Sequence, residues 1–164
     1  CTIDPEEVAR VFMDYEREKK VFGLFLSSGV IKSPDYTMEQ MNAAARILRR
    51  KYAFRGYIHL KVLPGVSNAA IEETLSLASA VSINIETPGE ERFAKLSTRK
   101  RYLDDIIRPL KRISSLTARG ERHARVKQTT QFIVGASDGL GAALAGATTF
   151  GTGAASRAGI IWSG

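Results

Sequence analysis

Polar residues alternate with apolar ones in two β-rich segments, so each segment places its polar side chains on one face. His59 and Lys61 alternate in "YIHLKVL" (57–63), and Asn84 and Glu86 alternate in "AVSINIE" (80–86). Because successive side chains of a strand point to opposite faces, the two members of each pair share a face. An imidazole, an amine, an amide and a carboxylate can hold a polar ligand, and those that are buried need hydrogen-bond partners. A purely structural role for the strand histidine is the alternative.

A turn with closely spaced glycines follows a further strand pattern. In "FIVGASDGLGAALA", Gly135, Gly139 and Gly141 stand between a strand pattern and a helix pattern. This turn is similar to the one with which short-chain dehydrogenases bind the pyrophosphate of NAD(P). The rest of the chain fits that family poorly, since 23 residues follow Gly141 and the Tyr-x-x-x-Lys of Tyr15 and Lys19 lies far upstream. An NAD(P)-dependent dehydrogenase is therefore the less favoured hypothesis.

The order of the elements predicts an α/β fold with a parallel sheet. Helical periodicity covers 3–20, 37–52, 68–79 and a longer region that ends near 115, and strand patterns cover 21–26, 57–63, 80–86 and 127–135. Asp4 and Pro5 suit the start of the first helix. Thr37 and Gln40 have the spacing of a capping box in the second helix. Pro109 should kink or divide the last helical region.

Strands and helices that alternate imply right-handed crossovers, which bring the carboxyl ends of the strands to one edge of the sheet. The segments that follow the strands, "SSGV", "LPG", "ETPG" and "GASDG", should therefore lie on a common rim, where α/β proteins usually bind ligands. A doubly wound sheet and part of a barrel both fit this pattern.

The composition is that of a single soluble domain. The chain has 164 residues, of which 44% are hydrophobic and 25% charged, and its net charge is +7. It has neither an apolar run of membrane-spanning length nor a signal peptide, so we expect a cytoplasmic protein without a membrane partner. The single cysteine excludes an internal disulfide and any metal or iron–sulfur site built from this chain's thiolates alone.

The positive charge gathers in three clusters, at 46–55, 97–112 and 118–127, with Tyr52, Phe54 and Tyr102 among them. Cations next to aromatic rings suit the phosphates and bases of a nucleic acid. A basic α/β module that binds DNA or another nucleic acid without catalysis is therefore an alternative function. Solvated faces of helices would explain the same charges.

The last part of the chain has a different composition. Residues 139–164 hold 7 of the 14 glycines, 7 alanines and one charged residue, Arg157. We therefore divide the chain into a folded region, 1–138, and a Gly/Ala-rich tail, 139–164, that should be disordered or loosely attached. A change of reading frame near Asp138 would explain the tail, and a genuine divergent C-terminus is the alternative.

From Thr2 to Asp138 the chain resembles a family of radical S-adenosylmethionine (SAM) proteins. The likeness is carried, in order, by "VFGLFLSSGVIKSPDYTMEQMNAAARILR", "FRGYIHLKVLPGVSNAAIEETLSLASAVSINIETPGEERFAKLS", "KRYLDDIIRPLKRI" and "KQTTQFIVGASD". Members are often described as enzymes of DNA modification or repair. The resemblance implies a parallel-sheet partial (β/α)6 barrel, of which this chain holds strands 2 to 5 and lacks the first and, we expect, the last.

The resemblance also implies roles for ten residues. The loop after the second strand commonly holds the amino group of SAM, the end of the fourth strand its ribose and carboxylate, and the fifth strand flanks its adenine. In that order the matching positions are Ser27, Ser28 and Gly29; Asn84 and Glu86; and Gln128, Thr130 and Gly135. His59 and Lys61 of the third strand could face the same cavity.

The defining motif of the superfamily, Cys-x3-Cys-x2-Cys, is absent. Its three thiolates hold a [4Fe–4S] cluster, which passes an electron from a donor to SAM and so generates a 5′-deoxyadenosyl radical. Cys1 cannot replace three ligands, and we assign no metal ligand and no catalytic residue in this chain. We expect the motif to lie upstream in an intact parent enzyme, of which this chain is a fragment that is inactive by itself.

Overall fold

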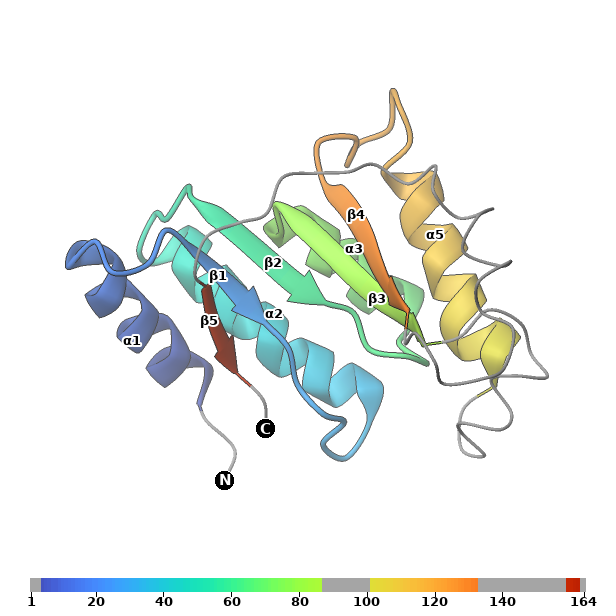
Figure 1. Cartoon of the computed structure of the whole chain (residues 1–164), viewed down its shortest axis with the longest axis horizontal. Helices are drawn as coiled ribbons and strands as arrows, with labels where there is room; N and C mark the ends of the chain where they lie inside the picture. The colour runs from blue at the N-terminus through green and yellow to red at the C-terminus, as the bar shows by residue number, and fades with distance from the viewer. Residues whose placement is uncertain (1–3, 87–100, 133–158, 163–164) are drawn as a thin grey trace.

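A five-stranded parallel sheet forms the centre of the protein (Figure 1). The computed structural model describes residues 4–86, 101–132 and 159–162. The strands lie in the order β4-β3-β2-β1-β5, and every neighbouring pair is parallel. Their bounds are β1 Gly23–Leu26, β2 Tyr57–Lys61, β3 Ala80–Glu86, β4 Lys127–Phe132 and β5 Gly159–Trp162. The predicted α/β fold with a parallel sheet is confirmed.

The helices connect the strands in sequence. They are α1 Pro5–Arg17, α2 Pro34–Arg50, α3 Asn68–Leu77, the π-helix η1 Tyr102–Ile107 and α5 Arg108–Leu116. Each of the first three follows an N-cap residue whose side chain accepts a backbone N–H of the first turn. These N-cap residues are Asp4, Ser33 and Ser67, respectively. Such N-caps satisfy N–H groups that the first helical turn leaves without a partner. The predicted start of the first helix at Asp4 and Pro5 is confirmed.

Helix α2 begins earlier than predicted. Its N-cap is Ser33, whose hydroxyl accepts the N–H of Tyr36 at 3.1 Å, and Pro34 occupies the first turn. Thr37, predicted as a capping residue, lies buried inside the helix. Its hydroxyl accepts the N–H of Ile31 at 2.8 Å and lies 2.9 Å from the carbonyl oxygen of Ile31. The capping-box prediction is wrong because this hydroxyl holds the loop before the helix instead.

Pro109 divides the last helical region, as predicted. Helix α5 follows η1 directly, and Pro109 lies in the first turn of α5. Proline lacks an N–H and cannot continue the regular α-helical hydrogen bonds, so the wider π-helical turns end at this point. Ile106 of η1 is fully buried and packs with Ile85 of β3 and the partly buried Tyr102 and Leu110.

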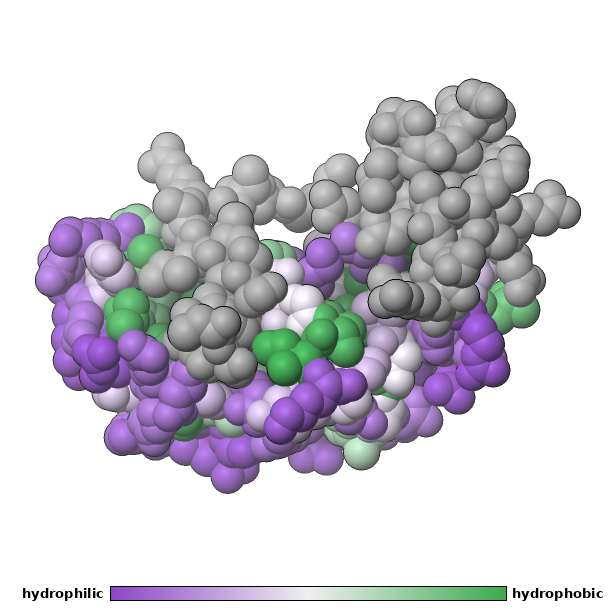
Figure 2. All heavy atoms as spheres, turned by 90° about the horizontal axis from the view of Figure 1, so that it is seen from below, coloured by the Kyte–Doolittle hydropathy of each residue, from purple (hydrophilic) through white to green (hydrophobic). Residues whose placement is uncertain are grey.

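All helices that the structure describes lie on one face of the sheet (Figure 1). Buried strand residues such as Leu24, Ile58 and Val81 point to these helices and share one hydrophobic cluster with Phe12 of α1 and Leu75 of α3. Alternate strand residues therefore point to the other face. Seen from the edge where the strands end, the outer surface is mostly hydrophilic, with hydrophobic residues gathered near its middle (Figure 2).

The end of the chain contributes an edge strand, which differs from the prediction. Strand β5 pairs in parallel with β1, with Ile160 beside Leu24 and Trp162 beside Leu26. The expectation that residues 139–164 are disordered or loosely attached is therefore wrong for β5. The reason is local, because "GIIW" is a short β-branched and aromatic run that suits an extended strand. The rest of the tail lies outside the described residues.

Candidate ligand-binding face of the sheet

The sheet face opposite the helices carries polar and aromatic side chains from three neighbouring strands. The register places Phe25 of β1 beside His59 of β2, and Lys61 of β2 beside Ser82 of β3. Asn84 stands two residues beyond Ser82 and so belongs to the same face. We call these five residues the polar sheet face. The structure thus brings together three of the predicted site residues, His59, Lys61 and Asn84.

His59 lies at the centre of the polar sheet face. Its Nε2 is 3.0 Å from the hydroxyl oxygen of Ser82, and the ring of Phe25 meets the imidazole edge-on with centroids 4.7 Å apart. Burial lowers the pKa of His59 from 6.5 to about 4. The imidazole is therefore neutral near pH 7, with one nitrogen that donates a hydrogen bond and one that accepts. Because Ser82 engages Nε2, the other nitrogen is the atom available to a ligand.

Lys61 and Asn84 stand nearer the carboxyl ends of their strands than His59 does. Lys61 is half-buried and forms no ion pair with another described residue. Asn84 is also half-buried. The register of β3 against β4 shifts between Asn84 and Glu86, which interrupts the alternation that was expected to place these two side chains on one face. The side chain of Glu86 lies outside the described residues.

The loop after β1 is partly closed by its own hydrogen bond. Ser28 is buried, and its hydroxyl donates to the carbonyl oxygen of Gly29 at 2.8 Å. Ser27 is half-buried and Gly29 is exposed. The donor of Ser28 is therefore used within the loop, whereas Ser27 and the backbone of Gly29 are the groups at which a ligand would find hydrogen-bonding atoms.

Two predicted residues of β4 point away from the polar sheet face. Gln128 lies beside Val81 and Thr130 beside Ile83, both of which belong to the hydrophobic core under the helices. The amide of Gln128 donates to the carbonyl oxygen of Leu110 in α5 at 3.5 Å. The hydroxyl of Thr130 donates to the carbonyl oxygen of Ile83 at 2.7 Å. The structure therefore does not bring these two side chains to the other site residues.

The glycine turn lies outside the described residues. Gly135, Gly139 and Gly141 all fall in 133–158, so both roles suggested for this turn stay predictions.

A second Tyr-x-x-x-Lys, Tyr57 and Lys61, lies on β2. Four residues of a strand span about 13 Å, so this pair does not place its two side chains next to each other.

Sequence reasoning missed Ser82 and Phe25. Ser82 stands two residues before Asn84, so its alternation with Val81 and Ile83 is visible in "AVSINIE". Phe25 looked like part of a uniformly apolar run. Its position on the polar sheet face follows only from the pairing of β1 with β2, which the sequence does not reveal.

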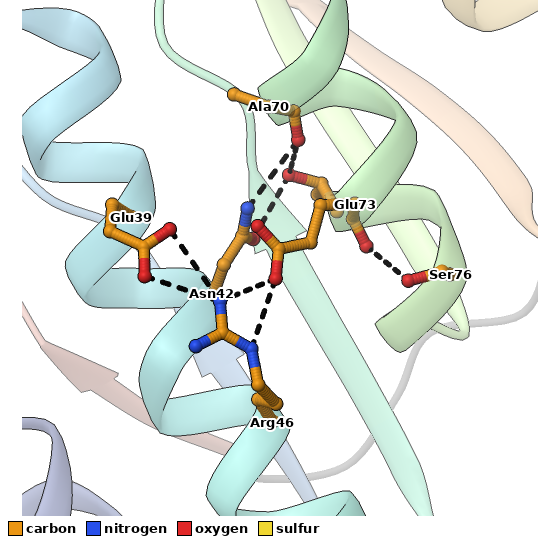
Figure 3. Close-up of polar contacts among 7 residues, drawn as sticks. Glu39, Asn42, Arg46, Ala70, Glu73 and Ser76 are labelled. Atoms are coloured by element: carbon orange, nitrogen blue, oxygen red, sulfur yellow. Dashed lines mark hydrogen bonds and ion pairs between the residues drawn. The ribbon is translucent and has the colours of Figure 1, made fainter.

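A second polar cluster lies between helices and has a structural role. Arg46 of α2 stands between Glu39 and Glu73 and is hydrogen bonded to both (Figure 3). The fully buried Asn42 accepts a hydrogen bond from the hydroxyl of Thr74 at 3.0 Å. These groups satisfy one another across α2 and α3, so the cluster joins the two helices and is not a candidate site.

The described residues contain no group of three or more His, Cys, Asp or Glu that could hold a metal ion. None of the described helices is both long and apolar enough to cross a membrane. No protein-family model matches the chain, and no curated protein shows significant sequence similarity to it.

Proposed function

We propose that this chain is part of the core of a radical SAM enzyme and that it binds SAM on the polar sheet face. The observation that supports the proposal best is the convergence of His59, Lys61 and Asn84 on one face of a parallel sheet whose described helices all cover the other. Strands β1 to β4 also follow one another in spatial order. This succession suits a barrel-type sheet better than a doubly wound one, in which the order reverses.

The donors on this face suit the chemistry of SAM, which carries a carboxylate, an amino group, a sulfonium and a nucleoside. The ammonium of Lys61 can pair with the carboxylate, and the hydroxyl of Ser27 can accept a hydrogen bond from the amino group. The neutral imidazole of His59 can hydrogen-bond a polar group without repelling the sulfonium. The side-chain amide of Asn84 has the donor and acceptor chemistry that suits a ribose hydroxyl.

The [4Fe–4S] cluster does not fit the residues of this chain. A radical SAM cluster needs three thiolates, and the sequence has one cysteine. We therefore assign no radical step to any residue here. For a longer protein that supplies the three cysteines, the proposal also includes cleavage of SAM, an electron donor and a substrate in DNA modification or repair. For this chain alone it includes only the binding of SAM.

Titration calorimetry of the chain with SAM tests the binding proposal. We expect saturable binding that the substitution Lys61→Met weakens by about tenfold or more, because a hydrogen bond to a charged group contributes about 1.5–3 kcal/mol. Lys111→Met is the matched control, since Lys111 is an exposed lysine of α5 and should leave the affinity unchanged. Absence of binding at millimolar SAM, or equal losses in both variants, would contradict the proposal.

A further inference from the structure

The amino ends of the strands form a second edge of the sheet, opposite the rim considered so far. All strands are parallel, so the segments that precede them lie together on this edge. Figure 1 shows the loop before β4 rising beyond the ends at which β2 and β3 begin. The segments concerned are 19–22 before β1, 55–56 before β2 and 117–126 before β4, and we call them the amino edge.

The amino edge is strongly basic. Together with Lys127, the first residue of β4, its segments contain seven cations and one acid, Glu121. The cations are Lys19, Lys20, Arg55, Arg119, Arg122, Arg125 and Lys127. All seven are exposed. Only Lys20 forms an ion pair with another described residue, the neighbouring Glu18.

Two arginines elsewhere in the described structure are paired within the fold. Arg46 pairs with Glu39 and Glu73, and Arg112 pairs with Glu72, so these charges are neutralised within the fold. On the amino edge six of the seven cations form no ion pair with a described residue, and they lie on three segments that are far apart in the sequence. Mutual repulsion among them is unfavourable unless an anion is bound, which suggests a polyanionic partner.

Exposed aromatic rings accompany these cations. Phe22 is 71% exposed and Tyr57, at the start of β2, is 36% exposed. Phe22 directly precedes β1, and Tyr57 begins the adjacent strand β2, where it lies beside Gly23. A planar base without a pairing partner can stack on such rings, whereas the bases of a duplex are already stacked.

A hollow lies at the β4 end of the amino edge. Its volume is about 460 Å³, and its wall includes Arg122, His123, Arg125 and, from the end of α3, Ser76. Between this hollow and the start of β1 lie three strand spacings, or about 14 Å at ~4.8 Å each. A chain of a few nucleotides can follow this path from the arginines of the loop to the ring of Phe22.

We infer that the amino edge binds single-stranded nucleic acid, with its arginines on the phosphates and with Phe22 and Tyr57 under the bases. This surface meets the polar sheet face at Tyr57, whose ring lies edge-on to that of His59 with centroids 6.3 Å apart. The inference does not depend on whether SAM binds on the polar sheet face. The six cations without an ion pair argue for phosphates, and the exposed rings argue for an unpaired strand.

Fluorescence anisotropy with a labelled oligothymidylate of about 20 nucleotides tests the inference, starting at about 50 mM KCl. We expect binding that weakens steeply with salt. The triple variant Arg119→Gln, Arg122→Gln and Arg125→Gln should bind at least about tenfold more weakly and lower the salt slope by about 2, since each phosphate contact of a single strand contributes ~0.7. Phe22→Ala, which removes a stacking ring without changing the charge, should weaken binding by about fivefold or more.

The matched control removes three exposed cations elsewhere, with Lys32→Gln, Arg108→Gln and Lys111→Gln, and should change the affinity less than about threefold. Equal losses in the two triple variants would overturn the inference, because binding would then follow the net charge alone. Two further results would also overturn it: tighter binding to a duplex or to phosphatidylserine vesicles than to the single strand, and complete displacement of the strand by a few millimolar inorganic phosphate.

Discussion

The buried histidine of the polar sheet face should make the stability of the protein depend on pH. Burial holds the pKa of His59 at about 4, whereas in the unfolded chain it returns to 6.5. Between these values the unfolded state binds more protons than the folded state, so stability falls as the pH falls. The contribution is complete above pH 6.5 and is lost on acidification towards pH 4.

The size of this effect follows from the difference between the two pKa values. A fall from 6.5 to about 4 corresponds to about 3 kcal/mol, at ~1.4 kcal/mol per unit. That amount is a large fraction of the free energy of unfolding of a typical domain, which is about 5–15 kcal/mol. Protonation would also place a positive charge beside Ser82 and Phe25, neither of which can neutralise it.

Urea unfolding of the wild-type chain and of His59→Gln, at several pH values between about 7.5 and 4, measures the contribution. Glutamine can keep a hydrogen bond to Ser82 and does not ionise in this range. We expect the wild type to lose about 3 kcal/mol more than the variant on acidification, since carboxylates titrate in both. Parallel pH dependences, or an imidazole that titrates near 6.5 in proton NMR of the folded chain, would refute this reasoning.

Two further predictions concern polar side chains that hydrogen-bond the helices to neighbouring segments. Arg49→Met should lower the free energy of unfolding by about 2–4 kcal/mol, because the guanidinium donates at 2.8–2.9 Å to three carbonyl oxygens, those of Phe54, Gly56 and Leu77; a loss no larger than that of Arg50→Met, an exposed control, would contradict this role. Thr37→Val should cost about 1–3 kcal/mol by leaving the N–H of Ile31 without its partner, and Thr37→Ser should restore most of that loss in the same urea assay. Equal losses in Val and Ser variants would show that packing, not the hydroxyl, matters at this position.

The features predicted correctly from the sequence are those that depend on neighbouring residues. Asp4 followed by Pro5 starts a helix, and Pro109 divides one, because N-caps and prolines act on the backbone within a few residues. The start of α2 shows the limit of this reasoning. Both Ser33-Pro34 and Thr37 with Gln40 are acceptable starts, and the structure selects the first because the hydroxyl of Thr37 bonds the loop at Ile31.

Features that depend on strand pairing could not be predicted from the sequence. The pattern of β4 shows that Gln128 and Thr130 share a face, but only the register against Val81 and Ile83 shows that it is the helix-covered face. The same holds for β5, which pairs with a strand more than a hundred residues earlier in the chain. For His59, Lys61 and Asn84, alternation with apolar residues on adjacent strands was enough to predict that they share one face of the sheet, and their role in a site stays a prediction.

The most direct test of the proposed SAM site is to map the ligand by NMR on the isotopically labelled chain. The account predicts that added SAM shifts the signals of His59, Lys61 and Ser82. Added SAM should leave nearly unchanged those of Gln128, on the helix-covered face of β4, and of Arg46 in α2. Shifts confined to the helical layer or to the amino edge, or no shifts at millimolar SAM, would contradict the assignment of the polar sheet face as the ligand-binding site.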